Sequence, residues 1–469
     1  MPAACAMHDA VDSILPSARA LLSAVRCEYA DIRLSDSDGT TITLSGEQVE
    51  TFSSGATIAG SVRVLCGGVW GFVSFNDPGR LERHFSRALE IAATVATSEK
   101  TRIRACAPVR KQVVTPAERD FSLVPLEEKF ALISSYNGIL RSSKLIQTTR
   151  ATYRDVRTYC AYLNSEGSEI TYDRAYCGVA FSSIARDGAI IQLFHESVSG
   201  YGGFELARGR EEMAEGVARR AVDLLAAEPV PGGTYRVVAD QKLAGVFIHE
   251  AFGHLSEADF VHENPRLREV MVLGRCFGPE GLTVIDNGDM PGLSGYIPVD
   301  DEGVLPGGTR LITNGCLSGR LHSRETAEKM GEEPGGNARA ISALSQPIVR
   351  MTNTYIENGS GTRDDLLQAA GDGIYAVGFI GGETNLEMFT FTSGCGYEIK
   401  NGKLGKMYRD MVLSGNVFTT LGNIATIGGD RIMYGGLGGC GKGGQSPLPV
   451  SFGGPHLLIT DVLVGGRHD

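Results

Sequence analysis

The sequence predicts an α+β protein of two domains: an N-terminal α+β domain with antiparallel strands over residues 1–230, and a C-terminal, mainly β domain over residues 231–469. Strand-type alternation and helical spacing occur together in the first half, whereas short strands and glycine turns fill the second. Between the two halves, residues 228–233 contain two prolines and two glycines, a composition that favours a boundary. A length of 469 residues also suits two or three domains.

Residues 1–26 are not expected to be a signal peptide, because no basic start precedes an apolar run. They predict an amphipathic helix instead. Antiparallel strands are expected between Tyr29 and Phe75, with turns at residues 37–39 and 67–68. The dipeptide Asp77-Pro78 then predicts a helix start, because aspartate caps helices and proline is favoured at their first position.

Two further helices and a second set of strands complete this half. Helical patterns cover residues 126–136 and 204–227. Strand patterns cover residues 147–198, with a hairpin turn at residues 164–167. We therefore expect helices packed against an antiparallel sheet.

The bulk composition indicates a cytoplasmic protein that binds neither nucleic acid nor membrane. The formal net charge is −11, whereas phosphate binding needs a basic face. No stretch approaches the ~18 apolar residues of a membrane span. The ten cysteines are scattered and contain no CxxC pair, so we expect no disulfide framework and a reducing compartment.

The segment His249-Glu250-Ala251-Phe252-Gly253-His254 carries the strongest chemical pattern. Asp240 can cap a helix that runs into this segment. Imidazoles bind zinc, and an adjacent glutamate can take a proton from an activated water. Histidines five residues apart lie ~140° apart on a regular α-helix, so both reach one ion only if a π-type turn or a break occurs near Gly253. The alternative is that both histidines are structural.

A resemblance to a known family favours the metal-binding interpretation. HEAFGHLSEADF resembles the HExxxH segment of the TldD/PmbA metallopeptidases, once labelled modulators of DNA gyrase. The N-terminal half is similar to the family through EYADIRLS and GSVRVLCGGVWGFVSFND. The histidine pair resembles the catalytic TldD type, because inactive paralogues lack it. Further similar blocks follow in the family order: DDEGVLPGGTRLITNGCLSG, VRMTNTYIENG, GIYAVGFIGGETN, GYEIKNGK and GGCGKGGQSPLPVSFGGPHLLITDVLVGG.

The resemblance implies a site and a function. It implies Zn²⁺ held by His249, His254 and Cys440, with Glu250 as the general base. It also implies a peptidase that hydrolyses unfolded or leader-type peptides. The family further implies a dimer, formed either with a second copy or with a PmbA-like paralogue.

Other residues near the site leave alternatives open. Glu257 and Asp259 could accept a histidine N–H, as residues around zinc ligands often do, or could be solvated carboxylates. Glu257 is also a rival third ligand. Lys442 is expected to favour the ionised sulfur of Cys440.

Two departures and one rival pattern bear on function. Cys395 stands where the family has an acidic residue, and GGETN at residues 381–385 differs from the family pattern, so contacts with substrate are in doubt there. Residues 436–442 also fit the glycine-rich pattern of a phosphate-binding loop, but the residue after Lys442 is glycine, and no helix can follow.

The alternatives to a zinc peptidase are a non-catalytic interaction subunit and a hydrolase that uses Cys440 or Cys395 as the nucleophile.

Overall fold

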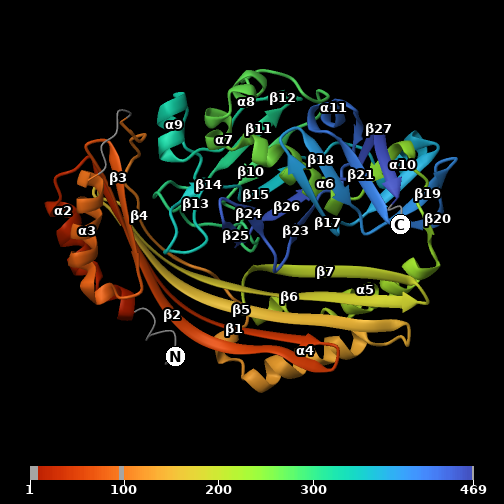
Figure 1. The fold of residues 1–469 in the computed structure, drawn as a ribbon, viewed down its shortest axis with the longest axis horizontal. Helices are drawn as coiled ribbons and strands as arrows, with labels where there is room; N and C mark the ends of the chain where they lie inside the picture. Colours follow the sequence, from red (N-terminus) through yellow and green to blue (C-terminus); the bar gives the residue numbers. More distant parts are fainter. Residues whose placement is uncertain (1–8, 95–99, 467–469) are drawn as a thin grey trace.

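The computed structural model describes residues 9–94 and 100–466. Its N-terminal half is built on a long, curved sheet of seven strands (Figure 1). The strand order is β3-β2-β1-β5-β6-β4, and β7 also pairs with β6. All neighbours are antiparallel except β4 and β6. The strands are β1 (Tyr29–Ser45), β2 (Gln48–Cys66), β3 (Val69–Phe75), β4 (Arg110–Val114), β5 (Ile146–Asn164), β6 (Glu169–Asp187) and β7 (Ile190–Tyr201).

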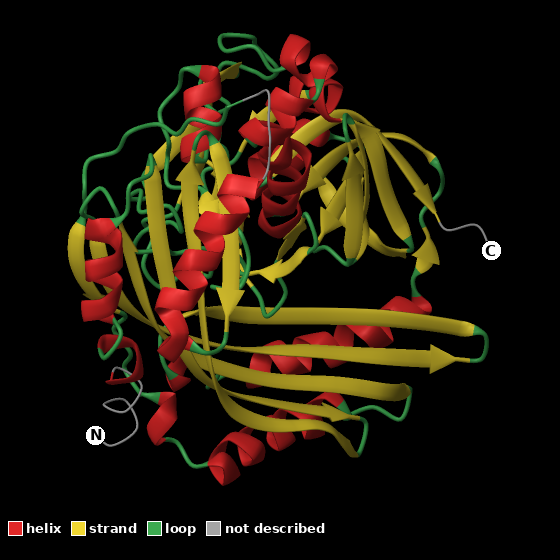
Figure 2. Ribbon diagram, turned by 60° about the vertical axis from the view of Figure 1, so that its left-hand side comes forward, coloured by secondary structure: helices red, strands yellow, loops and turns green. Residues whose placement is uncertain are grey.

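Helices cover this sheet in two groups, each with its own apolar core. The first group packs against β1 and β2 near one end of the sheet. The second group packs against β5, β6 and β7, on the face away from the C-terminal half (Figures 1 and 2). The first group is α2 (Leu15–Ala24), η1 (Pro78–Arg80) and α3 (Leu81–Thr94), and the second is η2 (Phe121–Leu123), α4 (Leu126–Leu140), η3 (Phe204–Leu206) and α5 (Glu211–Ala226).

The C-terminal half contains a ten-stranded sheet, a six-stranded sheet and two short hairpins. The ten-stranded order is β17-β18-β21-β27-β9-β16-β19-β20-β8, with β22 also paired to β27. The six-stranded order is β12-β11-β10-β15-β26-β23, and the hairpins are β13-β14 and β24-β25. The strands are β8 (Glu228–Pro229), β9 (Gly233–Ala239), β10 (Val284–Asn287), β11 (Gly308–Thr313), β12 (Cys316–Leu317), β13 (Ala338–Arg339), β14 (Ile348–Val349), β15 (Asn353–Ile356), β16 (Gly373–Val377), β17 (Gly381–Asn385), β18 (Met388–Thr392), β19 (Cys395–Lys400), β20 (Lys403–Arg409), β21 (Met411–Asn416), β22 (Ile424–Ile427), β23 (Ile432–Gly435), β24 (Cys440–Lys442), β25 (Gln445–Leu448), β26 (Ser451–Gly454) and β27 (Leu457–Gly466).

Helix α6 lies between the two larger sheets and contacts strands of both. Its close approach to β26 needs a glycine, because a Cβ on Gly245 would lie 2.8 Å from the backbone of Gly453. The apolar residues of α6 join the largest core of the protein. The helical segments of this half are α6 (Gln241–Ile248), η4 (His249–Gly253), η5 (His254–Ser256), α7 (Ala258–Glu263), α8 (Pro265–Val270), α9 (Arg324–Met330), α10 (Arg363–Ala370) and α11 (Val417–Gly422).

The predicted α+β class with antiparallel strands is confirmed, and so are the helix start at Pro78, the helix from residue 126 and the hairpin turn after Asn164. The single helix expected over residues 204–227 is instead the short η3 followed, after residues 207–210, by α5. The N-terminal helix is present as α2, and the part of that prediction within residues 1–8 lies outside the described residues. Among the described residues, no helix combines the length and the apolar character that a membrane crossing requires. The division at residues 230 and 231 stays a prediction.

The turn predicted at residues 37–39 is wrong, because β1 continues through it. Gly39 pairs with Gly55 of β2 on one side and with Val156 of β5 on the other. A Cβ at Gly39 would lie 2.6 Å from the Asp155 carbonyl oxygen. Glycine therefore serves a close approach between strands at this position rather than a turn.

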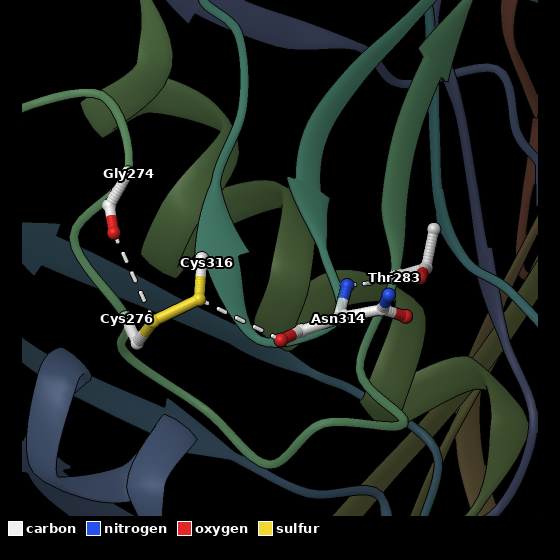
Figure 3. Close-up of a disulfide and its surroundings, with 5 residues drawn as sticks. All are labelled: Gly274, Cys276, Thr283, Asn314 and Cys316. Carbon is white, nitrogen blue, oxygen red and sulfur yellow. Dashed lines mark hydrogen bonds between the residues drawn. A yellow bond between two sulfur atoms is a disulfide. The ribbon is translucent and has the colours of Figure 1, made fainter.

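One disulfide, between Cys276 and Cys316, is present among the described cysteines (Figure 3). No spacing pattern predicted it, since the two residues are 40 positions apart and meet through an isolated antiparallel bridge. The other seven described cysteines are free, so a disulfide framework is not formed among them.

Candidate metal centre

Helix α6 is anchored at its first residue by a buried cap. Asp240 accepts the backbone N–H of Leu243 at 2.8 Å and that of Gly378 at 2.9 Å. The first bond caps the helix, and the second joins it to the chain that follows β16. The helix therefore enters the core at a fixed position and delivers His249 at its end.

A π-helical turn from His249 to Gly253 follows α6, as the five-residue spacing predicted. The His254 N–H bonds to the His249 carbonyl oxygen, which brings residues five apart into line. The two imidazole rings are 5.6 Å apart between centroids. Gly253 makes room for Met351 beside this turn, because a Cβ there would lie 2.1 Å from the Met351 sulfur.

Cys440 reaches the histidines from β24, 186 positions further along the chain than His254. Its sulfur lies 3.2 Å from Nε2 of His254. One ligand atom from each of His249, His254 and Cys440 lies within 4.8 Å of the other two. The structure thus brings together the three residues that the resemblance implied as ligands.

The donor set suits a metal ion. Nδ1 of His249 is buried and has no hydrogen-bond partner among the described residues, a condition that an ion at the site can explain. Two imidazoles and one thiolate are ligands that Zn²⁺ prefers, and a catalytic zinc keeps its fourth position open. These residues therefore fit a zinc ion.

The charges of the three groups depend on one another. Burial alone would raise the pKa of the Cys440 thiol, but its interactions with the imidazoles of His249 and His254 outweigh it and lower this pKa to about 4. Burial opposes the charged form of His254, but Glu257 and the sulfur raise its pKa well above the usual range. The thiolate, which is the form that binds metals, is favoured here.

Glu257 and Asp259 occupy different positions around this centre. Glu257 is fully buried, and its Oε2 lies 3.1 Å from Nδ1 of His254. Lys442 lies 3.0 Å from the same Glu257 oxygen and 2.7 Å from Asp259. Asp259 therefore meets the lysine rather than an imidazole. The Lys442 ammonium contacts these carboxylates, whereas the sulfur contacts His254, so the expectation that Lys442 favours the ionised sulfur stays a prediction.

The partly exposed Glu250 lines two cavities beside the ligands. Its Oε2 is 3.8 Å from Nε2 of His254. The larger cavity, about 750 Å³, is walled by β17, whose GGETN sequence departs from the family pattern. The smaller, about 230 Å³, has mainly apolar and aromatic walls, including Phe379 and Phe452. The carboxylate of Glu250 is thus next to both the ligands and the open space.

Two rival patterns find no support in the geometry. Cys395 is buried in the core, where burial raises its pKa to about 11, so its thiol stays protonated. The glycine-rich residues 436–442 end in the short hairpin of β24 and β25, without the helix that a phosphate-binding loop needs.

Arg350 is a residue of this centre that the sequence patterns missed. It is fully buried and donates to the carbonyl oxygens of Cys440 at 2.6 Å and Gln445 at 3.1 Å. It therefore holds the hairpin that carries the thiol. The available signal was an arginine within the otherwise apolar run IVRM, which does not reveal its partner.

Comparison with known proteins identifies the class. Models of the PmbA/TldA metallopeptidase match as domain 1 over residues 30–93, as central domain over 119–227 and as C-terminal domain over 232–466. A metalloprotease of Synechocystis sp. is 43% identical over 94% of this chain and 95% of its own. A zinc metalloprotease TldD homolog of Saccharolobus solfataricus is 32% identical over 68% of this chain and 72% of its own.

Solved structures agree on the fold. A Thermotoga maritima protein described as a modulator of DNA gyrase matches with a TM-score of 0.76 at 19% identity, covering 97% of this chain and 99% of its own. TldE from Thermococcus kodakarensis matches with a TM-score of 0.72 at 15% identity, covering 97% and 100%. Sequence matches and fold together define the class of the protein, which is a metallopeptidase. Within that class, the chain belongs to the PmbA/TldD family.

Proposed function

We propose that this protein hydrolyses unfolded or leader-type peptides, with Zn²⁺ held by His249, His254 and Cys440 and with Glu250 as the general base. The observation that carries the proposal is the convergence of the three ligand atoms within 4.8 Å, next to the Glu250 carboxylate. The name of the Saccharolobus relative favours zinc as the metal. When bound, Zn²⁺ supplies Lewis-acid polarisation of the carbonyl and acidifies water at the site.

The residues of the chain handle protons and orientation. The Glu250 carboxylate accepts a proton from the attacking water and passes it to the leaving amine. Glu257 accepts the Nδ1–H of His254, which leaves Nε2 free as the ligand atom. The half-buried position of Glu250 between two cavities lets a peptide lie on both sides of it.

An extended substrate is favoured by the strand that walls the larger cavity. β17 is the last strand of the ten-stranded sheet and pairs only with β18 among the described strands. Its free edge can accept the backbone of an unfolded peptide as an added strand, which gives affinity without strong side-chain selectivity.

Dimer formation belongs to the same proposal. The fold similarity to TldE supports a partner of PmbA/TldE type, and a second copy of this chain is the alternative. A cytoplasmic location stays a prediction from the composition.

The test replaces Glu250 with glutamine, which keeps the shape and removes the basicity. Zinc content should persist, while peptide cleavage falls by about 10²–10⁴-fold. Glu263→Gln, the same change at an exposed residue in the wall of the larger cavity, is the matched control and should retain activity. Full turnover by Glu250→Gln would refute its role.

A cysteine nucleophile is the second candidate, because the contact of 3.2 Å between Cys440 and His254 also suits a thiolate–imidazolium pair. A chelator separates the two mechanisms. Removal of the metal should abolish cleavage, and added Zn²⁺ should restore it. Cleavage by metal-free protein that stops on thiol alkylation would instead assign the reaction to the cysteine, and no cleavage under any condition would indicate a non-catalytic subunit.

A further inference from the structure

A third cavity, of about 280 Å³, lies between the N-terminal sheet and the C-terminal half. One wall comes from β5, β6 and β7 of the curved sheet, which Figure 1 shows beneath the C-terminal strands. The other wall comes from loops of the C-terminal half, including Leu437 and Gly438. We call it the arginine cavity, because Arg154, Arg174 and Arg339 all line it.

None of these three arginines is in salt-bridge contact with a carboxylate of the described residues. Arg339 donates to the carbonyl oxygens of Met351 and Pro449, so its N–H groups are in use. Arg174 is partly buried, and its guanidinium carbon lies 5.4 Å from the ring centre of Tyr172 and 5.9 Å from that of Tyr201. It donates to the Cys160 sulfur at 3.9 Å.

The two carboxylates that line the cavity, Asp300 and Asp301, make their direct contacts with other groups. Asp301 pairs with Arg33 at 3.3 Å and also accepts the N–H of Ala340. Asp300 accepts three backbone N–H groups of its own and neighbouring loops. Arg154 and Arg174 therefore line the cavity without a carboxylate in salt-bridge contact among the described residues, and Asp301 acts on Arg174 only from a longer distance.

Such a surface selects one kind of ligand. A guanidinium withdrawn from water loses solvation, and a ligand carboxylate can offset that loss. Its planar N–H fork matches the two oxygens of a carboxylate, and aromatic faces beside it fix its orientation. A carboxylate is therefore the group that this cavity would bind.

The arginine cavity adjoins the metal centre through one short segment. Gly438 lines both this cavity and the 230 Å³ cavity that contains His249, Glu250 and Cys440. A Cβ at Gly438 would meet no atom within 4 Å, so open space lies beside it. The segment is held in place from the curved sheet: Tyr176 donates to the Gly436 carbonyl oxygen at 3.1 Å, and Ser197 accepts the N–H of Leu437 at 2.8 Å.

We infer that Arg154 and Arg174 bind a carboxylate of the peptide substrate, first of all its free C-terminal carboxylate, while the bond to be cleaved lies beside Glu250. This inference rests on the proposed peptidase function. An extended peptide advances ~3.3 Å per residue, so a fixed end sets the position of cleavage. Cleavage should then occur a constant, small number of residues from the C-terminus.

The test compares three peptides that share one sequence without other acidic residues: a free C-terminus, an amidated C-terminus, and an amidated peptide that ends in glutamate. The zinc-loaded wild type should cleave the free peptide with a kcat/KM about 10- to 100-fold above the plain amide, the loss expected when a charged hydrogen bond is removed. If the amidated glutamate peptide recovers the rate, the carboxylate site is supported and also accepts an acidic side chain.

Arg174→Gln should abolish the preference for a free C-terminus, because cleavage of the free peptide should slow to the rate of the amidated peptide. Arg154→Gln, at an exposed position, should reduce the preference without the risk to folding that a change beside two tyrosines carries. Arg186→Gln is the matched control, because Arg186 lies exposed on the same strand β6 but outside the cavity, and it should keep the preference.

Peptide binding supplies a readout that does not need turnover. Fluorescence anisotropy with Glu250→Gln should rank the three peptides in the same order, and adding Arg174→Gln should remove the ranking. Equal cleavage of free and amidated peptides by active wild-type protein, or a preference that survives both arginine substitutions, overturns the inference. Failure of the proposed function looks different, since no peptide would then be cleaved while the anisotropy comparison still reports on the arginine cavity.

Discussion

Glu257→Gln tests how the chain orients a metal ligand. Glu257 is fully buried, with Oε2 at 3.1 Å from Nδ1 of His254 and 3.0 Å from Nζ of Lys442. The carboxylate fixes the tautomer of the imidazole and raises its basicity, so that Nε2 faces the Cys440 sulfur. Glutamine keeps the volume and one acceptor oxygen but removes the charge.

The expected loss follows from this contact. Replacing a group that hydrogen-bonds a metal-ligating histidine lowers metal affinity by about 10- to 100-fold. This corresponds to about 1.4–2.8 kcal/mol of binding free energy. Lys442 retains Asp259 at 2.7 Å and the Val349 carbonyl oxygen at 2.9 Å. The metal-free variant should therefore lose less unfolding free energy than the ~3–5 kcal/mol of a broken buried ion pair.

The assay is a competition titration of metal-free protein against a chromophoric zinc chelator. Asp259→Asn is the control, because it also removes a carboxylate from Lys442 but touches neither histidine. It should change zinc affinity much less than Glu257→Gln does. An unchanged zinc affinity in Glu257→Gln, or an equal loss in both variants, would refute the reasoning.

Two further changes test the ligand set and the π-helical turn. Cys440→Ser should lose zinc on dialysis together with peptide cleavage, and full zinc retention in that variant, with loss in Glu257→Gln, would transfer the role of third ligand to Glu257. Gly253→Ala should lower the free energy of unfolding in urea by about 1–3 kcal/mol, because its Cβ would meet the Met351 sulfur at 2.1 Å. Gly216→Ala in α5, where a Cβ meets nothing within 4 Å, is its control and should be neutral or stabilising; equal losses in both would contradict the role of this close approach.

The helix distortion at the histidine motif could be predicted, because the five-residue spacing restricts the directions in which the two imidazoles point around a helix. Two imidazoles five residues apart face one point only if the helix widens or breaks between them, and the π-helical turn at His249–Gly253 meets that condition. The same kind of reasoning failed at Gly39. A glycine after polar residues has the local pattern of a turn, but the two partner strands that hold it extended are distant in sequence.

The third ligand shows where reasoning from the residues ends. Nothing around Cys440 in the sequence distinguishes a ligand from an inert residue in a glycine turn, and only the family resemblance singled it out. Its position depends on Arg350, which donates to its carbonyl oxygen from 90 residues away. The ionisation of its thiol depends on His249 and His254 rather than on the nearby Lys442, whose charge is taken by carboxylates of another segment. Sequence proximity therefore did not reveal these imidazoles, because the partners of a charged side chain in a buried site are set by the fold.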